Sequence, residues 1–390
     1  MTQEKKEIIA RNQEIAILLA LIKSKSPEFL AVYGRRRIGK TFLIREFLSA
    51  HKITSLLITG TKDASKQRQL ENFTDRFSEL FHQDLPLKTL SFKTWKAALE
   101  TLTASIKKSN RFTLKKPFVL FLDELPWLAG PKSNLLQELD YFWNTQWSAM
   151  PQFKLIVCGS AASWMLEKLV NAKGGLHNRL TKILNLQPFS LAQTAEFLTY
   201  CRAKFTPSEI IDLYLVTGGV PFYLEKINPK LSVHQNIQEL CFSEDGFLKT
   251  EFPRLFKSLF DSEIAHQALI ELIAKKNSGL SRDEITKSKI IQTGGRLSQY
   301  LTELEAAGFI KSFVPYGNQK RNQFFKVIDE YSLFYLKWIA PSHNQTLGFT
   351  KTHWLDQMRT PKWPIWAGLA LEGICQKHFN QIREALGLLH

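Results

Sequence analysis

Short apolar runs rich in branched side chains alternate with helix-period segments through the first 200 residues of the chain. Five runs predict strands, at residues 29–33, 55–59, 118–122, 154–158 and 182–186. Helical patterns begin between them, near Thr41, Ser65, Phe92, Asn134 and Ala161. Apolar strands that alternate with helices are typical of a parallel sheet covered by helices. The pattern therefore predicts a three-layer α/β domain over residues 1–205.

From about Ser190 the pattern becomes helical, with breaks at residues 218–221 (Gly-Gly-Val-Pro) and 228–229 (Asn-Pro). This predicts a helical lid over residues 206–261. Three further helical patterns are followed by two strand-like runs, which a basic turn at residues 316–321 joins. Helices followed by a hairpin indicate a winged helix over residues 262–330. Residues 331–390 form an aromatic C-terminal segment.

The chain has no run of roughly 18 uncharged apolar residues, which a membrane helix needs. Its first residues also lack the apolar core of a signal peptide. The four cysteines are widely spaced and form no Cys-x-x-Cys pair, so neither a disulfide framework nor a zinc site is indicated. We therefore expect a cytoplasmic protein with no membrane partner.

The net charge of +16 is unevenly distributed along the chain. Residues 1–205 hold 31 Lys and Arg against 17 Asp and Glu, a net +14, whereas residues 206–390 hold 21 against 19, a net +2. Residues 88–116 carry eight basic side chains against Glu100 alone. This stretch is interpreted either as a solvated surface or as a contact for DNA or an acidic partner.

One segment of the chain matches the phosphate-loop pattern G-x-x-x-x-G-K-[ST]. A predicted strand leads into it and a predicted helix leads out, as a loop that cradles phosphates requires. Backbone N–H groups would converge on the phosphates, Lys40 would reach the β and γ oxygens, and the Thr41 hydroxyl would ligate Mg²⁺. The residues expected to bind ATP here are Gly34, Arg35, Arg36, Arg37, Ile38, Gly39, Lys40, Thr41 and Phe42. The three arginines occupy variable positions, where a solvated basic cap is the alternative interpretation.

A second acidic motif ends the predicted strand at residues 118–122. Asp123 and Glu124 follow at the rim where α/β folds place ligands. We expect Asp123 to hold Mg²⁺ through its water shell and Glu124 to orient and deprotonate the attacking water. Residues 51–117, between the two motifs, are numerous enough for another strand and helices. This predicts a sheet with the strand order 5-1-4-3-2, the ASCE type. Ser160, at the tip of the next strand, is interpreted either as a polar nucleotide sensor or as a helix N-cap.

These motifs and their order resemble the archaeal-type P-loop ATPases of the STAND group, within the AAA+-like superfamily. The resemblance rests on GRRRIGKT, VLFLDELPW, LIVCGSAASWM, the Arg179 before KILNLQPFS, and TGGVPFYLEK. It implies a winged helix and then a C-terminal domain called DUF234, which resembles a PD-(D/E)xK nuclease. The resemblance covers nearly the whole chain.

The resemblance also implies roles for residues outside the two main motifs. Arg179 matches an arginine proposed to touch the γ-phosphate; the alternative interpretation is an ordinary surface arginine. Gly218, Gly219 and Pro221 match a motif through which the lid senses nucleotide. Family members carry an aromatic-apolar-Gly-Arg-x-x-Glu stretch near the adenine, and this chain matches only its Arg and Glu, at Arg11 and Glu14. Arg11 is therefore a candidate for adenine contact.

The C-terminal segment departs from the family pattern. The Asp and Glu-x-Lys strands that would hold a catalytic metal are absent downstream of Glu372. We therefore expect a truncated nuclease-like region with no nuclease activity.

Three functions remain open at the level of sequence. The first is a Mg²⁺-dependent ATPase that hydrolyses ATP slowly and acts as a molecular switch. The second is an ATP-regulated DNA-binding protein that uses Arg296 and Gln299, the turn residues Lys320 and Arg321, and residues 88–116. However, residues 262–330 carry a net charge of only +2, from ten basic and eight acidic side chains. The third is an interaction scaffold that docks a partner or forms a homo-oligomer.

Overall fold

The computed structural model describes residues 7–81, 90–171, 175–291, 295–316, 323–341 and 352–388. These form two compact units. The first comprises residues 1–35 and 39–186, and the second comprises residues 36–38 and 187–390. The three residues at positions 36–38 therefore pack with the second unit although they lie inside the phosphate loop.

The first unit contains a parallel sheet of five strands in the order β2-β3-β4-β1-β5. Read from the other edge this is 5-1-4-3-2, so the predicted fold class is confirmed. Central strands β1, β3 and β4 are buried along their full length, as strands covered on both faces must be. The strands are β1 Glu28–Tyr33, β2 Thr54–Thr59, β3 Phe118–Asp123, β4 Phe153–Gly159 and β5 Lys182–Asn185.

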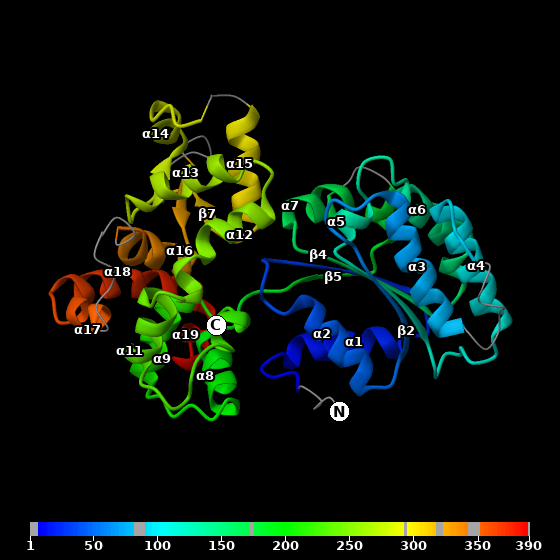
Figure 1. The fold of residues 1–390 in the computed structure, drawn as a ribbon, viewed down its shortest axis with the longest axis horizontal. Coiled ribbons are helices and arrows are strands. Elements are labelled where there is room, and N and C mark those ends of the chain that lie inside the picture. Colours follow the sequence, from blue (N-terminus) through cyan, green and yellow to red (C-terminus); the bar gives the residue numbers. More distant parts are fainter. Residues whose placement is uncertain are drawn as a thin grey trace. The chain divides into compact units, whose positions relative to one another are not determined.

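Helices flank this sheet (Figure 1). The α-helices are α1 Asn12–Lys23, α2 Lys40–Ala50, α3 Lys66–Phe81, α4 Trp95–Lys108, α5 Leu125–Leu128, α6 Leu135–Thr145 and α7 Ala162–Met165. Shorter helical turns are η3 Trp147–Ala149, η4 Leu166–Val170 and η5 Gly175–Arg179. Helix α4 begins where Thr94 caps it, its hydroxyl accepting a hydrogen bond from the N–H of Ala97.

The second unit is mainly helical. Its first part contains α8 Leu191–Tyr200, α9 Pro207–Thr217, α10 Pro221–Leu224, α11 Val233–Ile237, η6 Gln238–Phe242, η7 Phe247–Lys249 and α12 Glu251–Leu259. Capping boxes begin α8, α9 and α11, which explains why Ser190, Thr206 and Ser232 precede these helices.

A three-stranded antiparallel sheet of order β6-β8-β7 follows in the same unit. The helices and strands of this part of the unit are α13 Glu263–Ala274, β6 Leu280–Ser281, α14 Arg282–Lys287, α15 Gly295–Ala306, β7 Ile310–Phe313 and β8 Phe324–Val327. Strand β6 was not predicted, because two residues are too short a run to show an alternating pattern. The assignment of this region as a winged helix stays a prediction.

The C-terminal segment packs through aromatic rings. Trp354 is fully buried, stacks on Phe242 with ring centroids 5.5 Å apart, and meets Trp363 edge-on at 4.9 Å. Ring pairs in these geometries stabilise the fold by more than the burial of their apolar surface alone. The helices of this segment are α16 Glu330–Phe334, η8 Tyr335–Ile339, α17 His353–Met358, α18 Lys362–Lys377 and α19 Phe379–Ala385.

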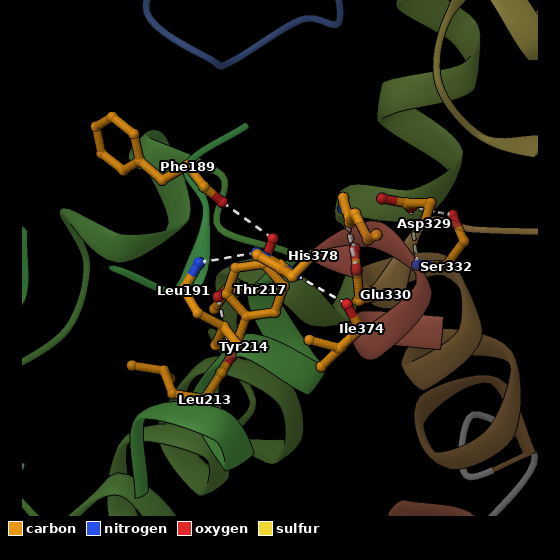
Figure 2. A network of polar contacts seen from close by, with 11 residues as sticks. Phe189, Leu191, Leu213, Tyr214, Thr217, Asp329, Glu330, Ser332, Ile374 and His378 are labelled. Atoms are coloured by element: carbon orange, nitrogen blue, oxygen red, sulfur yellow. Dashed lines mark hydrogen bonds and ion pairs between the residues drawn. The ribbon is translucent and has the colours of Figure 1, made fainter. Parts of the chain in front are cut away.

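The same segment contacts the end of α9, as Figure 2 shows. His378 accepts a hydrogen bond from the N–H of Leu191 at 3.0 Å, and its other ring nitrogen lies 2.8 Å from the carbonyl of Ile374. The Tyr214 hydroxyl donates to the carbonyl of Phe189 at 3.0 Å. These hydrogen bonds connect residues 187–191 to helix α9 and to the end of helix α18.

Some sequence predictions fall outside this description. Lys88, Lys320 and Arg321 lie outside the described residues. None of the helices in the described ranges is long and apolar enough to cross a membrane.

Candidate functional site

The candidate phosphate loop joins the buried strand β1 to helix α2. Gly39 is the N-cap of α2 and has φ +86°, a left-handed conformation that glycine adopts without the steric cost of a side chain. Because α2 begins at Lys40, the unpaired N–H groups of its first turn lie next to the loop. This is the backbone arrangement that binds phosphate at a helix N-terminus.

Lys40 is held inside the loop. Its ammonium group donates hydrogen bonds to the carbonyls of Gly34 at 2.8 Å and Arg35 at 2.7 Å, and the residue is 6% exposed. These bonds fix the position of a long, otherwise flexible side chain. The positive charge is thus kept within the turn that would surround a phosphate group.

Thr41, in the first turn of α2, meets Asp123 at the end of β3. The Thr41 hydroxyl lies 3.0 Å and 2.9 Å from the two carboxylate oxygens of Asp123. Asp123 is 2% exposed, and this burial raises the pKa of its carboxyl group, while the bond from Thr41 lowers it. A hydroxyl and a carboxylate oxygen are hard donors, so the pair fits the ligand preference of Mg²⁺.

Glu124, the next residue, has a positive φ of +50° and is the N-cap of α5. Its carboxylate accepts hydrogen bonds from the Ser160 hydroxyl at 3.0 Å and 2.9 Å and from the Ser160 N–H at 3.2 Å. A left-handed conformation at a non-glycine residue is uncommon and is found at functional sites when its surroundings enforce it. The backbone and Ser160 together fix the direction of this carboxylate.

The alternative interpretation of Ser160 as a helix N-cap is wrong. Helix α7 begins at Ala162, its N-cap is Ala161, and no side chain caps it. The Ser160 hydroxyl instead donates to the carboxylate of Glu124. The sequence pointed to Ser160 because this residue follows the end of β4, but it did not predict that Glu124 is the hydrogen-bond partner.

Comparison with known families agrees with this geometry. A family model described as an ATPase domain predominantly from Archaea matches residues 9–227. The chain belongs to this family. It is therefore a P-loop ATPase, and the predicted ATP-binding class is confirmed at this level.

Relatives of this archaeal-type ATPase include an uncharacterized protein of Methanocaldococcus jannaschii. That protein is 26% identical over 343 residues, which are 86% of this chain and 69% of the relative. A Walker-type ATPase of Pyrococcus abyssi has a similar fold, with a TM-score of 0.58 and 18% identity, over 84% of this chain and 96% of the other. The ORC2 protein of Aeropyrum pernix, in complexes with ADPNP and ADP, gives a TM-score of 0.52 at 14% identity, over 91% and 96% of the two chains.

Two of the three arginines in the phosphate loop of this archaeal-type ATPase do not belong to a solvated cap. Arg35 is only 5% exposed, and the side chain of Arg37 is 21% exposed. The solvated-cap interpretation is therefore wrong for these two residues. Arg36 is half-buried and lies between them.

Arg37 pairs with a carboxylate far along the chain. Its guanidinium lies 2.6 Å from Glu251, whose side chain is fully buried and also accepts a hydrogen bond from the Tyr223 hydroxyl at 3.1 Å. The guanidinium carbon also lies 4.6 Å from the ring centre of Phe222 and 5.0 Å from that of Phe247. No sequence motif pointed to Glu251, because its partner is 214 positions away (251 minus 37).

The remaining predicted site residues have other surroundings. Arg11 is buried and pairs with Glu14 at 3.1 Å, and burial lowers the pKa of its guanidinium. Arg179 is 38% exposed and lies 3.8 Å from Asp140 of α6. Phe42 is half-buried in the first turn of α2, and Pro221 is the first residue of α10. Their roles toward nucleotide stay predictions.

The lid turn, residues 218–221 in the predicted lid, has a close backbone contact. Gly219 has φ +67°, and a Cβ added there would lie 2.1 Å from the carbonyl oxygen of Phe189. The N–H of Phe189 donates to the carbonyl of Gly219 at 2.8 Å. Only glycine fits this position, which gives the Gly-Gly-Val-Pro sequence a structural reason.

Proposed function

We propose that this protein is a nucleotide-operated switch that hydrolyses ATP slowly and whose lid responds to the loss of the γ-phosphate. The observation that carries the proposal is the packing of residues 36–38 of the phosphate loop with the second unit. Arg37 is held there by Glu251, Phe222 and Phe247. The loop that would bind phosphate thus includes residues that pack with the predicted lid.

ATP is the expected nucleotide. The Aeropyrum pernix ORC2 protein, which has a similar fold, forms complexes with ADPNP and ADP, and this supports an adenine nucleotide here. Lys40 would contact the β and γ oxygens from the position that its bonds to Gly34 and Arg35 define. Arg11 remains the candidate for adenine contact.

Mg²⁺ is the expected cofactor, and Thr41 and Asp123 would hold it. Bound by these two side chains, Mg²⁺ would supply positive charge that neutralises part of the charge on the phosphate groups. The hydrogen bond between the two side chains places both donors at one point near the start of α2. Asp123 lies at the end of β3, so the sheet itself fixes that position.

Glu124 is the proposed general base. It would orient and deprotonate the attacking water, while Ser160 holds its carboxylate in place. Arg179 would supply a positive charge to the transferred phosphoryl group, from its own chain or from a second copy. Its exposure of 38% leaves the guanidinium accessible for this purpose.

The proposed switch depends on the contact between Arg37 of the phosphate loop and Glu251 of α12. Loss of the γ-phosphate would change the contacts of the loop backbone, and Arg37 would pass this change to Glu251 at the start of α12. The lid would then shift relative to its nucleotide-bound state.

The first prediction tests the two central roles in one experiment. Glu124→Gln should bind ATP with the affinity of the natural protein while its turnover falls at least about 100-fold, the usual contribution of a general base. Lys40→Ala should instead weaken ATP binding itself. Affinity is measured with a fluorescent ATP analogue, and turnover by phosphate release in the presence of Mg²⁺.

Two outcomes would contradict these assignments. Undiminished hydrolysis by Glu124→Gln would remove Glu124 from its role. Equal ATP affinity in Lys40→Ala and in the natural sequence would overturn the phosphate-loop assignment. A suitable control is Lys52→Ala, because Lys52 is an exposed lysine just beyond α2.

A further inference from the structure

A cavity of about 460 Å³ lies inside the second unit. Helices α9, α13, α16 and α18 line it together with strands β7 and β8. Pockets for small molecules are usually concave and measure roughly 300–1,000 Å³. The cavity has the size of a ligand site, and the proposed ATPase function makes no use of it.

The inner wall of the cavity is apolar. Leu215, Ile273 and Ile374 are buried there, at 2%, 0% and 1% exposure. Trp366 also lines it and is fixed from behind by Trp363, at a ring-centre distance of 5.4 Å, and by Phe334, at 5.8 Å. A rigid aromatic face next to aliphatic side chains suits the body of an aromatic ligand.

Two lysines lie side by side at the edge of this cavity. Lys311 and Lys326 are directly opposite each other in the β7–β8 pair, and both line the cavity. Like charges in directly opposite positions destabilise a strand pair. Within the described part of the chain, neither lysine forms an ion pair. Their two charges are therefore available to one anionic group.

The other charges of the lining do not cancel this pair. Lys377 is bonded to Glu330 at 2.9 Å, and Lys276 is bonded to Glu284 at 2.9 Å. Apart from these two ion pairs, the charged residues of the lining are Lys311, Lys326 and the single acid Glu372, a net +1. An anion bound at Lys311 and Lys326 would offset that excess.

We propose that this cavity binds a small organic anion with an aromatic body. The aromatic part lies against Trp366, Ile273 and Leu215, and the anionic group accepts hydrogen bonds from Lys311 and Lys326. The Glu330–Lys377 pair forms part of the wall. A Cβ added at Gly218 would lie 3.0 Å from the Glu330 carboxylate. The Glu330–Lys377 pair therefore borders both the cavity and the lid turn.

The test uses two probes that differ only in charge. 1-Anilinonaphthalene-8-sulfonate carries an anionic group on an aromatic body, and N-phenyl-1-naphthylamine is the same body without the sulfonate. Each is titrated into the full chain by fluorescence. We expect saturable binding of the sulfonate at one site. The double variant Lys311→Gln/Lys326→Gln should weaken it at least about tenfold, as loss of hydrogen bonds to a charged group does.

A matched double variant provides the control. Lys275→Gln/Lys287→Gln removes two exposed lysines of neighbouring helices that do not line the cavity, and it should leave sulfonate affinity unchanged. N-Phenyl-1-naphthylamine should bind equally to all three proteins. Ala370→Phe, which fills part of the cavity, should weaken both probes.

Three outcomes would overturn the proposal. The first is the absence of saturable sulfonate binding by the natural sequence. The second is an equal loss in the two lysine double variants, because this would indicate general surface attraction. The third is unchanged affinity of both probes in folded Ala370→Phe, because the probes would then be bound elsewhere.

Discussion

Single side chains of the candidate site are held in position by hydrogen bonds to their neighbours. Lys40 is bonded to carbonyls of its own loop, Thr41 to Asp123, and Glu124 to Ser160. Each charged or hydroxyl group that the proposed chemistry needs is positioned by a neighbour within the first unit. Such positioning lowers the entropy that must be lost when substrate binds.

Ser160 provides a test of this positioning. We expect Ser160→Ala to lower kcat about tenfold at unchanged ATP affinity, because one hydrogen-bonding group of the Glu124 carboxylate is lost and only the backbone N–H remains. Ser160→Thr keeps the hydroxyl and should restore most of the rate. Steady-state hydrolysis with Mg²⁺-ATP measures both variants. A rate increase in Ser160→Ala would mean that Ser160 restrains Glu124 instead of positioning it.

Arg37 provides a second test, on stability. Arg37→Ala should lower the free energy of unfolding by about 3 kcal/mol, because it removes the cation 2.6 Å from the buried carboxylate of Glu251. The neighbouring Arg36→Ala removes the same charge from a half-buried side chain and should change stability by no more than about 0.5 kcal/mol. Urea unfolding followed by circular dichroism compares the two. Equal losses would show that the Arg37–Glu251 pair contributes nothing specific.

At the scale of elements, the lid turn depends on one close backbone contact. Gly219→Ala should destabilise the protein by roughly 3 kcal/mol or more, since it combines a left-handed backbone with a Cβ 2.1 Å from the Phe189 carbonyl. Gly308→Ala is the matched control. Its φ is +77° but nothing lies within 4 Å of an added Cβ, so only the conformational cost of about 1–2 kcal/mol should appear. Thermal unfolding of both variants checks this, and similar losses would contradict the steric argument.

The sheet was predictable from the sequence because its strands are buried on both faces. Such strands are continuous apolar runs, and Asp123 at the end of one of them marks the rim of the sheet. Strand β6 was not predictable, because it has two residues and depends on its pairing with β8. The π-helical turns η4, η6 and η8 were also missed, because a change from i+4 to i+5 hydrogen bonding leaves little trace in an apolar pattern.

The site itself was predictable only where its residues are close in sequence or end neighbouring strands. The spacing from Gly34 to Thr41 defines the loop, and the ends of β3 and β4 bring Glu124 and Ser160 together. The pairing of Arg37 with Glu251 depends on how the second unit folds. No local pattern records such a contact.

For the whole molecule, the uneven charge has consequences for nucleic acids. The first 205 residues carry a net +14 and the rest +2. We expect any DNA binding to be independent of sequence, to weaken steeply with salt, and to depend on the basic half. Lys107→Glu/Lys108→Glu in α4 should reduce it more than Arg296→Glu/Lys287→Glu in the second unit. Anisotropy titrations of a labelled duplex at several salt concentrations compare the variants, and a larger loss from the second pair would assign the contact to the predicted winged helix.

The position of residues 36–38 bears on how the protein can be divided for experiments. These residues belong to the second unit by packing, although residues on both sides of them belong to the first. A fragment that stops at Leu186 would retain the complete phosphate-loop sequence but would lose Phe222, Phe247 and Glu251, which hold Arg37. Nucleotide affinity measured on such a fragment would therefore describe a loop that lacks the contacts of Arg37.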